Sequence, residues 1–160
     1  MSQTGHILII DDEAPLRQTL ARILQRAGHE VTTAERGQMG LSLLSSAVFD
    51  LVYMDIRMPG MAGLEVLKIM HASQPTLPVV LFTAQPDLHS AVEALRLGAT
   101  DYLLKPLQPQ VLIDRTQAIL VRQEKERRKR DILLQIQSLQ AELKSLEGGE
   151  ESRAPAYIHE

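Results

Sequence analysis

The stretch LVYMDIRMPG, residues 51–60, runs a short apolar segment directly into an aspartate and then into a turn. A continuous apolar run of this length is typical of a strand that is covered on both faces of a sheet. Pro59 and Gly60 favour a sharp turn just beyond it. The sequence therefore predicts that Asp55 lies at the end of an interior strand, half sheltered and half open. There it is either a cap or a reactive carboxylate.

Further apolar runs and helical patterns alternate along the chain on both sides of this stretch. Strands are expected at residues 6–10, 30–34, 49–54, 78–83 and 100–105. Apolar residues between them recur at helical spacing, as in Leu64, Leu67 and Met70 or in Leu88, Val92 and Leu95. Gly28 and Gly98 mark helix ends. The pattern predicts an α/β fold: a doubly wound parallel sheet of five strands with helices on both faces.

Composition restricts the class of protein. The chain has 160 residues, of which 44% are hydrophobic and 23% charged, so one core with an appendage is expected. It contains no cysteine, which argues against disulfides and thiolate metal sites. The N-terminus lacks an export leader, and no apolar run is long enough to cross a membrane. A cytoplasmic protein without a membrane contact is predicted.

Polar residues follow the predicted strands at the edge where open parallel sheets carry their functional groups. They are Asp11 and Asp12 after the first strand, Asp55 after the third, Thr83 after the fourth and Lys105 after the fifth. If the strand order is 2-1-3-4-5, the flavodoxin-like order, the three aspartates meet across a crevice. Clustered carboxylates repel one another unless a cation lies among them, and an oxygen-only ligand set suits Mg²⁺.

Four motifs in this order, ILIIDDE, LVYMDIRMPGMAGLEVL, VVLFTA and GATDYLLKP, resemble the receiver domain of two-component response regulators over about residues 5–121. The resemblance implies that Asp55 accepts a phosphoryl group from a sensor histidine kinase and that Asp11 and Asp12 bind Mg²⁺. It also implies a phosphoacceptor signalling domain, rather than an enzyme, that assists its own phosphorylation and dephosphorylation. The backbone carbonyl of Arg57 would complete the metal site, and Lys105 would hold the phosphoryl oxygens.

The same resemblance implies a conformational switch. Thr83 would turn toward the new phosphoryl group and the ring of Tyr102 would follow inward, which would change the face formed by the fourth helix, fifth strand and fifth helix. The bond from Lys105 to Pro106 is expected to be cis, a form that proline makes accessible.

The residues also bear on functions other than phosphorylation. Binding of flavin or nucleotide phosphates would need a loop rich in backbone amides after the first strand, but DDEAP, residues 11–15, puts negative charge there. A receiver-like module that dimerises or binds proteins without phosphorylation stays open as the alternative, because a motif match is a hypothesis.

The C-terminal third predicts one long helix. No proline or glycine interrupts residues 110–147, and a seam of apolar residues recurs at spacings of three and four: Ile132, Ile136, Leu139, Leu143 and Leu146. We expect residues 1–121 to be the receiver domain, 122–147 a coiled-coil linker that makes a homodimer through 132–146, and 148–160 a flexible tail. The basic run 122–130 is interpreted as a solvated helix face, so direct nucleic-acid binding is not expected. The sequence leaves two readings of the output open: an output domain that follows Glu160 in a longer regulator, or a short stand-alone regulator that works through protein contacts.

Overall fold

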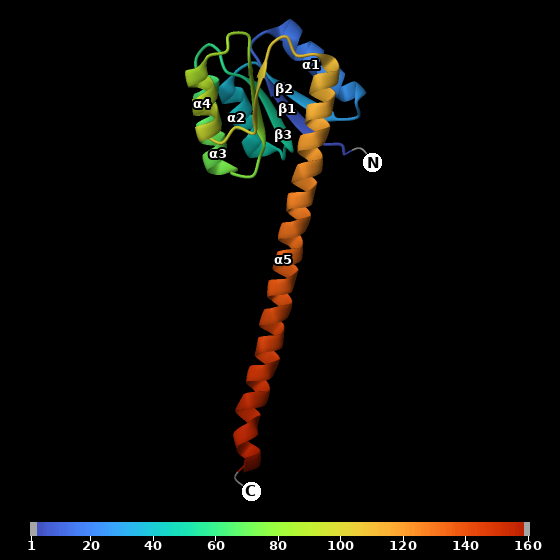
Figure 1. Cartoon of the computed structure of the whole chain (residues 1–160), viewed down its shortest axis with the longest axis vertical. Coiled ribbons are helices and arrows are strands. Elements are labelled where there is room, and N and C mark those ends of the chain that lie inside the picture. Colours follow the sequence, from blue (N-terminus) through green and yellow to red (C-terminus); the bar gives the residue numbers. More distant parts are fainter. Residues whose placement is uncertain (1–2, 159–160) are drawn as a thin grey trace. The chain divides into compact units, whose positions relative to one another are not determined.

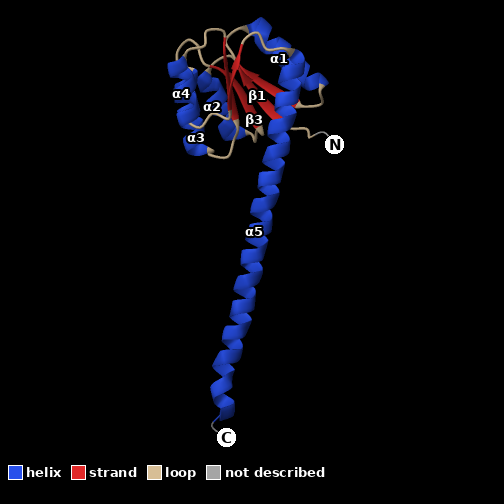
Figure 2. Ribbon diagram, in the orientation of Figure 1, coloured by secondary structure: helices blue, strands red, loops and turns tan. Residues whose placement is uncertain are grey.

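The computed structural model describes the backbone of residues 3–158 and the side chains of residues 3–148. Its centre is a parallel sheet of five strands in the order β2-β1-β3-β4-β5 (Figure 1, Figure 2). The strands are β1 (His6–Ile10), β2 (Glu30–Ala34), β3 (Leu51–Asp55), β4 (Val79–Thr83) and β5 (Asp101–Leu104). The helices are α1 (Ala14–Arg26), α2 (Gly37–Ser46), α3 (Gly63–Ser73), α4 (Leu88–Arg96) and α5 (Pro109–Ile158). The predicted fold class, strand order and long C-terminal helix are confirmed.

The chain divides into two compact units, Met1–Val121 and Arg122–Glu160. The first contains the sheet, helices α1 to α4 and the beginning of α5. Within the described part of the chain, no helix combines the length and the apolar character that a membrane span requires.

Side chains of the central strands alternate between two hydrophobic cores, one on each face of the sheet. Leu8, Ile10, Val52 and Met54 point into the core shared with α2, α3 and α4. The intervening residues, including Ile7, Ile9 and Tyr53, point into the core shared with α1 and the first turns of α5. Every residue of β3 and β4 is buried, which explains why these strands read as continuous apolar runs.

β1 and β2 match the predicted strands, and the ends of the other three strands differ from the prediction by one or two residues. β3 begins at Leu51 rather than at residue 49, and the Phe49 ring packs at a tilt of 37° against the His6 ring, with ring centroids 4.2 Å apart. Gly28 and Gly98 take positive φ angles of 101° and 96° directly after α1 and α4, so both act as the helix ends that the sequence predicted.

The apolar face of α4 does not pack on the sheet as its helical spacing suggested. Leu88, Val92 and Leu95 are 81%, 45% and 64% exposed, whereas Ala94 is completely buried. In this helix, the apolar residues at helical spacing therefore mark an exposed face. A small residue allows α4 to approach the sheet closely, and the larger apolar side chains remain on its outer side.

The fifth helix is longer than predicted. It continues to Ile158, so the expectation that it ends near Glu147 was wrong. Glycine weakens a helix by only about 1 kcal/mol relative to alanine, so a pair of glycines need not end one. The predicted flexibility of residues 148–160 stays a prediction, because residues 159–160 and the side chains from residue 149 onward lie outside the described part.

A buried hydrogen bond ties the start of α5 to the middle of the sheet. The hydroxyl groups of Tyr53 and Thr116 lie 2.6 Å apart, and both residues are completely buried. Burial raises the pKa of Tyr53 to about 12, so the phenol stays protonated at neutral pH. The pair fixes where α5 crosses the central strand β3.

We expect Tyr53→Phe to lower the free energy of unfolding by about 1–3 kcal/mol, because the Thr116 hydroxyl would be buried without a partner. Thr116→Val should cost a similar amount for the same reason. The double variant should be close to wild type, since both polar groups are then gone. Urea denaturation of the four proteins measures the coupling. A double variant as unstable as the sum of the single variants would contradict it.

Candidate functional site

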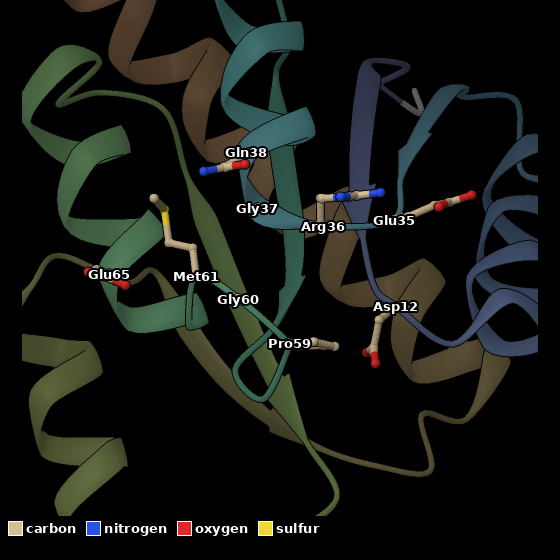
Figure 3. A pocket seen from close by; sticks show the side chains of 9 residues that line it. All are labelled: Asp12, Glu35, Arg36, Gly37, Gln38, Pro59, Gly60, Met61 and Glu65. Carbon is tan, nitrogen blue, oxygen red and sulfur yellow. The ribbon is translucent and has the colours of Figure 1, made fainter.

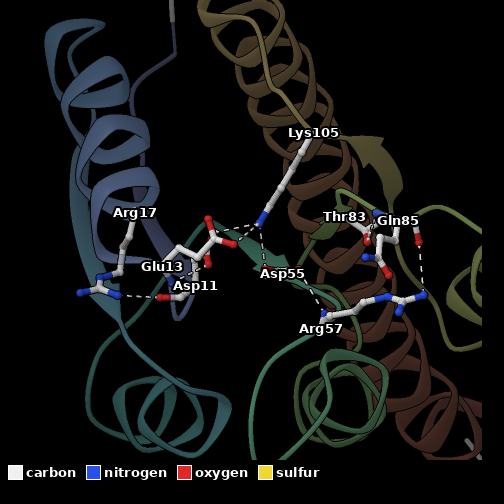
Figure 4. Close-up of polar contacts among 8 residues, drawn as sticks. All are labelled: Asp11, Glu13, Arg17, Asp55, Arg57, Thr83, Gln85 and Lys105. Carbon is white, nitrogen blue, oxygen red and sulfur yellow. Dashed lines mark hydrogen bonds and ion pairs between the residues drawn. The ribbon is translucent and has the colours of Figure 1, made fainter.

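Four strands deliver polar side chains to one edge of the sheet, as the sequence predicted. Asp11 follows β1, Asp55 ends β3, Thr83 ends β4 and Lys105 follows β5. Because β1, β3, β4 and β5 are neighbours in this order, their carboxyl ends meet there. Figure 4 shows the contacts among these residues.

Lys105 is the centre of the charge network. Its Nζ donates a hydrogen bond of 2.9 Å to Oδ2 of Asp55. The same atom lies 3.5 Å from Oδ2 of Asp11 and 3.9 Å from Oε1 of Glu13. The Lys105 side chain is only 10% exposed, so these interactions are weakly screened by solvent.

Asp55 is more deeply buried than expected. The sequence suggested a half-open position, but the residue is 4% exposed, so this expectation was wrong. The Lys105 ammonium covers Oδ2, and the backbone N–H of Arg57 donates to Oδ1 at 3.1 Å. Both carboxylate oxygens therefore have a donor, which explains how a charged group is kept at this depth.

Burial and the surrounding charges act in opposite directions on the pKa values of the neighbouring groups. It raises the pKa of Asp11 to about 6, against the opposing effects of the Glu13 N–H and Lys105 and with the help of the Asp55 and Glu13 charges. Burial by itself would lower the pKa of Lys105. The hydrogen bond to Asp55 and the surrounding carboxylates outweigh burial and raise this pKa above its usual value, so the lysine remains a cation.

The acidic residues fit a divalent cation. Oxygen atoms of Asp11, Asp12 and Asp55 lie within 4.8 Å of one another. Oδ2 of Asp11 is buried and makes no hydrogen bond among the described residues, although the Lys105 ammonium lies 3.5 Å away. An all-oxygen set with a buried carboxylate oxygen that lacks a hydrogen bond is the kind of donor set that Mg²⁺ prefers.

Asp12 differs from the other two aspartates because it is exposed. It lies at the edge of a pocket of about 610 Å³, which the N-terminal end of α2 and the loop after β3 also line (Figure 3). Arg36, Gly37, Pro59 and Gly60 are among the residues around it. The acidic cluster is therefore open to solvent on the side of Asp12.

The loop after β3 is held close to the strand end. The N–H of Gly63 donates to the carbonyl of Ile56 at 2.8 Å. A Cβ atom at position 63 would lie 2.5 Å from the carbonyl oxygen of Asp55. Only glycine allows this approach, and the approach keeps Arg57 beside Asp55.

Thr83 and Tyr102 lie where the sequence placed them. The Thr83 side chain is almost completely buried and its Oγ1 accepts a hydrogen bond of 3.1 Å from the N–H of Gln85. The Tyr102 ring packs against the core, and its hydroxyl is buried without a hydrogen-bond partner among the described residues. The buried position of this ring therefore carries the cost of an unsatisfied polar group.

Sequence reasoning missed Arg17. This residue is buried, and its Nη1 donates to the backbone carbonyl of Asp11 at 2.7 Å. It shares the inner face of α1 with Leu20, Ala21 and Leu24. A charged residue in the register of an apolar face was the available signal, because such a residue needs a buried partner.

The side chain of Arg57 was also missed, since the sequence assigned a role only to its carbonyl. Its guanidinium contacts the carbonyl of Gln85 at 3.4 Å and the carboxylate of Asp87 at 3.6 Å. Both partners belong to the segment between β4 and the start of α4, distant in sequence from Arg57. No local spacing could have indicated this pair.

A carboxylate held by an ammonium, beside acidic ligands for a divalent cation, is suited to accept a phosphoryl group. Comparison with known proteins points the same way. FixJ, a transcriptional regulatory protein of Bradyrhizobium diazoefficiens, is 43% identical over 108 residues, which are 68% of this chain and 53% of FixJ. NtrC, a DNA-binding transcriptional regulator of Escherichia coli, is 45% identical over 104 residues, 65% of this chain and 22% of NtrC. The chain thus spans about half or less of these relatives.

Solved structures show the same fold. A CheY-like response regulator receiver domain protein from Methanospirillum hungatei superposes with a TM-score of 0.75 at 32% identity, covering 78% of this chain and 99% of that one. NtrX from Brucella abortus gives 0.77 at 32% identity over 81% of this chain and 30% of its own. The family model for the response regulator receiver domain matches residues 7–117. The chain therefore belongs to the family of response regulator receiver domains.

Proposed function

We propose that Asp55 accepts a phosphoryl group from a sensor histidine kinase in a Mg²⁺-dependent reaction, and that this modification controls an output such as transcription. The observation that carries the proposal is the buried pair of Asp55 and Lys105, 2.9 Å apart, inside a cluster of carboxylates. The names of FixJ and NtrC as transcriptional regulators support the choice of output.

In the proposed reaction, an oxygen of Asp55 attacks the phosphorus of a phosphohistidine. The new P–O bond forms as the P–N bond breaks, and the histidine nitrogen keeps the electron pair. The Lys105 ammonium moves from Oδ2 of Asp55 to the incoming phosphoryl oxygens, while the Arg57 N–H holds Oδ1 in place. Mg²⁺ held by Asp11, Asp12, Asp55 and the Arg57 carbonyl would neutralise charge on those oxygens. The domain assists its own phosphorylation and dephosphorylation and turns over no other substrate.

We infer that Thr83 and Tyr102 transmit the modification. The Thr83 hydroxyl can donate to a phosphoryl oxygen because the contact with Gln85 uses it only as an acceptor. The Tyr102 hydroxyl is buried without a hydrogen-bond partner among the described residues, which destabilises the observed position of the ring. A small change nearby can therefore shift the equilibrium between this position and a second one.

Exposed apolar residues mark the surface that would respond. Leu88, Val92 and Leu95 on α4, Leu104 on β5 and Val111 at the start of α5 are all more than 40% exposed. Several large apolar side chains on neighbouring elements are typical of a protein-binding surface. This α4-β5-α5 face supports control of an output by contact with another protein segment.

For the C-terminal region we propose a dimer. Residues 122–147 would act as a coiled-coil linker after the receiver domain of residues 1–121. Ile132, Ile136, Leu139, Leu143 and Leu146 are between 45% and 64% exposed in the single chain, and their spacing matches a coiled-coil seam. Parallel pairing would bring two tails together for a symmetric output. The two helices should splay along the basic run 122–130, because like charges across the dimer axis repel. We assign this run to a solvated helix face.

We place the protein in the cytoplasm.

Treatment with acetyl phosphate and Mg²⁺ is expected to add one phosphoryl group, visible by intact mass spectrometry. Asp55→Asn and excess EDTA should each abolish the added mass, because one removes the nucleophile and the other the cation. Asp50→Asn is a matched control. Asp50 directly precedes Leu51, the first residue of β3, so it lies at the end of the strand away from Asp55. Asparagine can still accept the hydrogen bond from the backbone N–H of His6. Labelling that survives in Asp55→Asn would contradict the proposal and favour the phosphorylation-independent module.

Asp11→Asn is expected to raise the free energy of unfolding in EDTA by about 1–2 kcal/mol, because burial disfavours the ionised Asp11 carboxylate and the asparagine carries no charge. The asparagine can still accept the 2.9 Å bond from the Glu13 N–H. Mg²⁺ should raise the Tm of wild type but not of this variant. Asp12→Asn, at the exposed position, should also lose the Mg²⁺ effect with little change in EDTA. Destabilisation of Asp11→Asn in EDTA would contradict this account.

Sedimentation should show a dimer of wild type at tens of micromolar and a monomer of the double variant Ile136→Asp, Leu139→Asp, because the charges would lie in the seam. The matched control is the double variant Leu134→Asp, Ala141→Asp, which adds the same charge. Each residue advances about 100° around the helix axis, so these two positions lie on the side opposite the seam. It should remain dimeric. A monomeric wild type, or dimers of both variants, would show that this seam is not the contact.

A further inference from the structure

The side chain of Arg57 joins the phosphoacceptor loop to the start of α4. Its backbone N–H donates to Oδ1 of Asp55 at 3.1 Å. Its Nη2 donates to the carbonyl of Gln85 at 3.4 Å and lies 3.6 Å from Oδ2 of Asp87. Figure 4 shows the side chain extending from the loop after β3 to Gln85, which follows β4. One residue therefore contacts both the carboxylate and the segment that leads into α4.

Asp87 determines how α4 begins. It is the N-cap residue, and its Oδ1 accepts a hydrogen bond of 2.8 Å from the N–H of Ser90. Its Oδ2 accepts a second bond of 2.8 Å from the Ser90 hydroxyl. These bonds, with a smaller contribution from Arg57, hold the pKa of Asp87 below its usual value, so the residue is ionised at neutral pH. A cation beside Asp87 thus acts on the first turn of α4.

We propose that the Arg57 side chain couples the charge on Asp55 to the N-terminus of α4. With Asp55 unmodified, the guanidinium restrains Gln85 and Asp87. Once Asp55 carries a phosphoryl group, the phosphoryl oxygens compete for the guanidinium and its contacts with Gln85 and Asp87 weaken. The inference rests on the proposed phosphorylation of Asp55 and makes Arg57 a positioning residue rather than a catalytic one.

Charge and exposure support this competition. A phosphoryl group offers three strong acceptor oxygens and more negative charge than a carboxylate. Arginine matches phosphate geometry with two parallel donors. The Arg57 and Asp87 side chains are 56% and 42% exposed, so their ion pair is weak. Little free energy is therefore needed to move the guanidinium away from Asp87. The stronger acceptor should therefore displace the weaker one.

The consequence falls on the exposed apolar face of α4. Leu88, in the first turn of that helix, is 81% exposed, and Val92 follows one turn later. Loss of the Arg57 contacts would loosen the turn that carries Leu88. This route reaches α4 through Asp87 at its N-terminus. It meets the route through Thr83 at Gln85, whose carbonyl accepts from Arg57 and whose N–H donates to Thr83.

Hydrogen–deuterium exchange of residues 88–91 in the full chain tests the coupling, with and without acetyl phosphate and Mg²⁺. Arg57→Gln removes the cation. Asp87→Asn removes the charge but keeps a residue that caps helices well. Arg96→Gln is the matched control, because Arg96 pairs with Glu93 at 3.4 Å on the same helix, away from Asp87.

In the unmodified proteins, Arg57→Gln and Asp87→Asn should each speed exchange of this turn by about two- to fivefold, the range expected for an exposed ion pair. Phosphorylation should speed exchange by a similar factor in wild type and in Arg96→Gln, but add little in the other two variants. If the two substitutions only weakened packing, phosphorylation would still speed exchange of this turn in Arg57→Gln and Asp87→Asn.

Intact mass measured on the same samples separates the two possible failures. If Arg57→Gln takes up the phosphoryl group and its α4 exchange still rises as much as in wild type, the coupling through Arg57 is overturned while phosphorylation of Asp55 stands. If wild type takes up no phosphoryl group, the proposed function fails and this inference fails with it.

Discussion

The ion pair between Lys105 and Asp55 is the interaction on which the site depends. Removing Lys105 would leave the buried Asp55 carboxylate without its cation, which costs far more than an exposed pair contributes. Because the two residues follow different strands, the pair also requires β3, β4 and β5 to be adjacent and in register. The position of Lys105 after β5 and the burial of Asp55 at the end of β3 therefore depend on each other.

Charge at this edge of the sheet is unbalanced. The carboxylates of Asp11, Glu13 and Asp55 surround one buried ammonium, and Asp12 lies close to the other two aspartates. A carboxylate oxygen of Asp11 is buried without a hydrogen bond among the described residues. Such a site is not optimised for stability. Strained or underpaired groups collect at functional sites, and the rest of the fold compensates for their cost. Here the two hydrophobic cores on either side of the sheet supply that compensation.

The contacts of Arg57, Thr83 and Gln85 place a second layer of structure around Asp55. None of these contacts is strong, and several involve exposed side chains. Weak contacts are what a reversible signal requires, because a group that adds one charge can redistribute them. The rigid part of the molecule, fixed by bonds such as that between Tyr53 and Thr116, provides the frame against which these small changes act.

By itself, the sequence determined the order of strands and helices, the strand ends that carry functional groups and the presence of a long final helix. These features follow from local periodicity and from motifs that a parallel sheet brings to one edge, so they are encoded residue by residue. Tertiary structure alone decided the burial of Asp55, the role of Arg17 on the inner face of α1, the outward face of α4 and the pairing of Arg57 with Asp87. Each of these depends on which distant residues come into contact, and neither burial nor pairing across such separations leaves a local pattern in the chain.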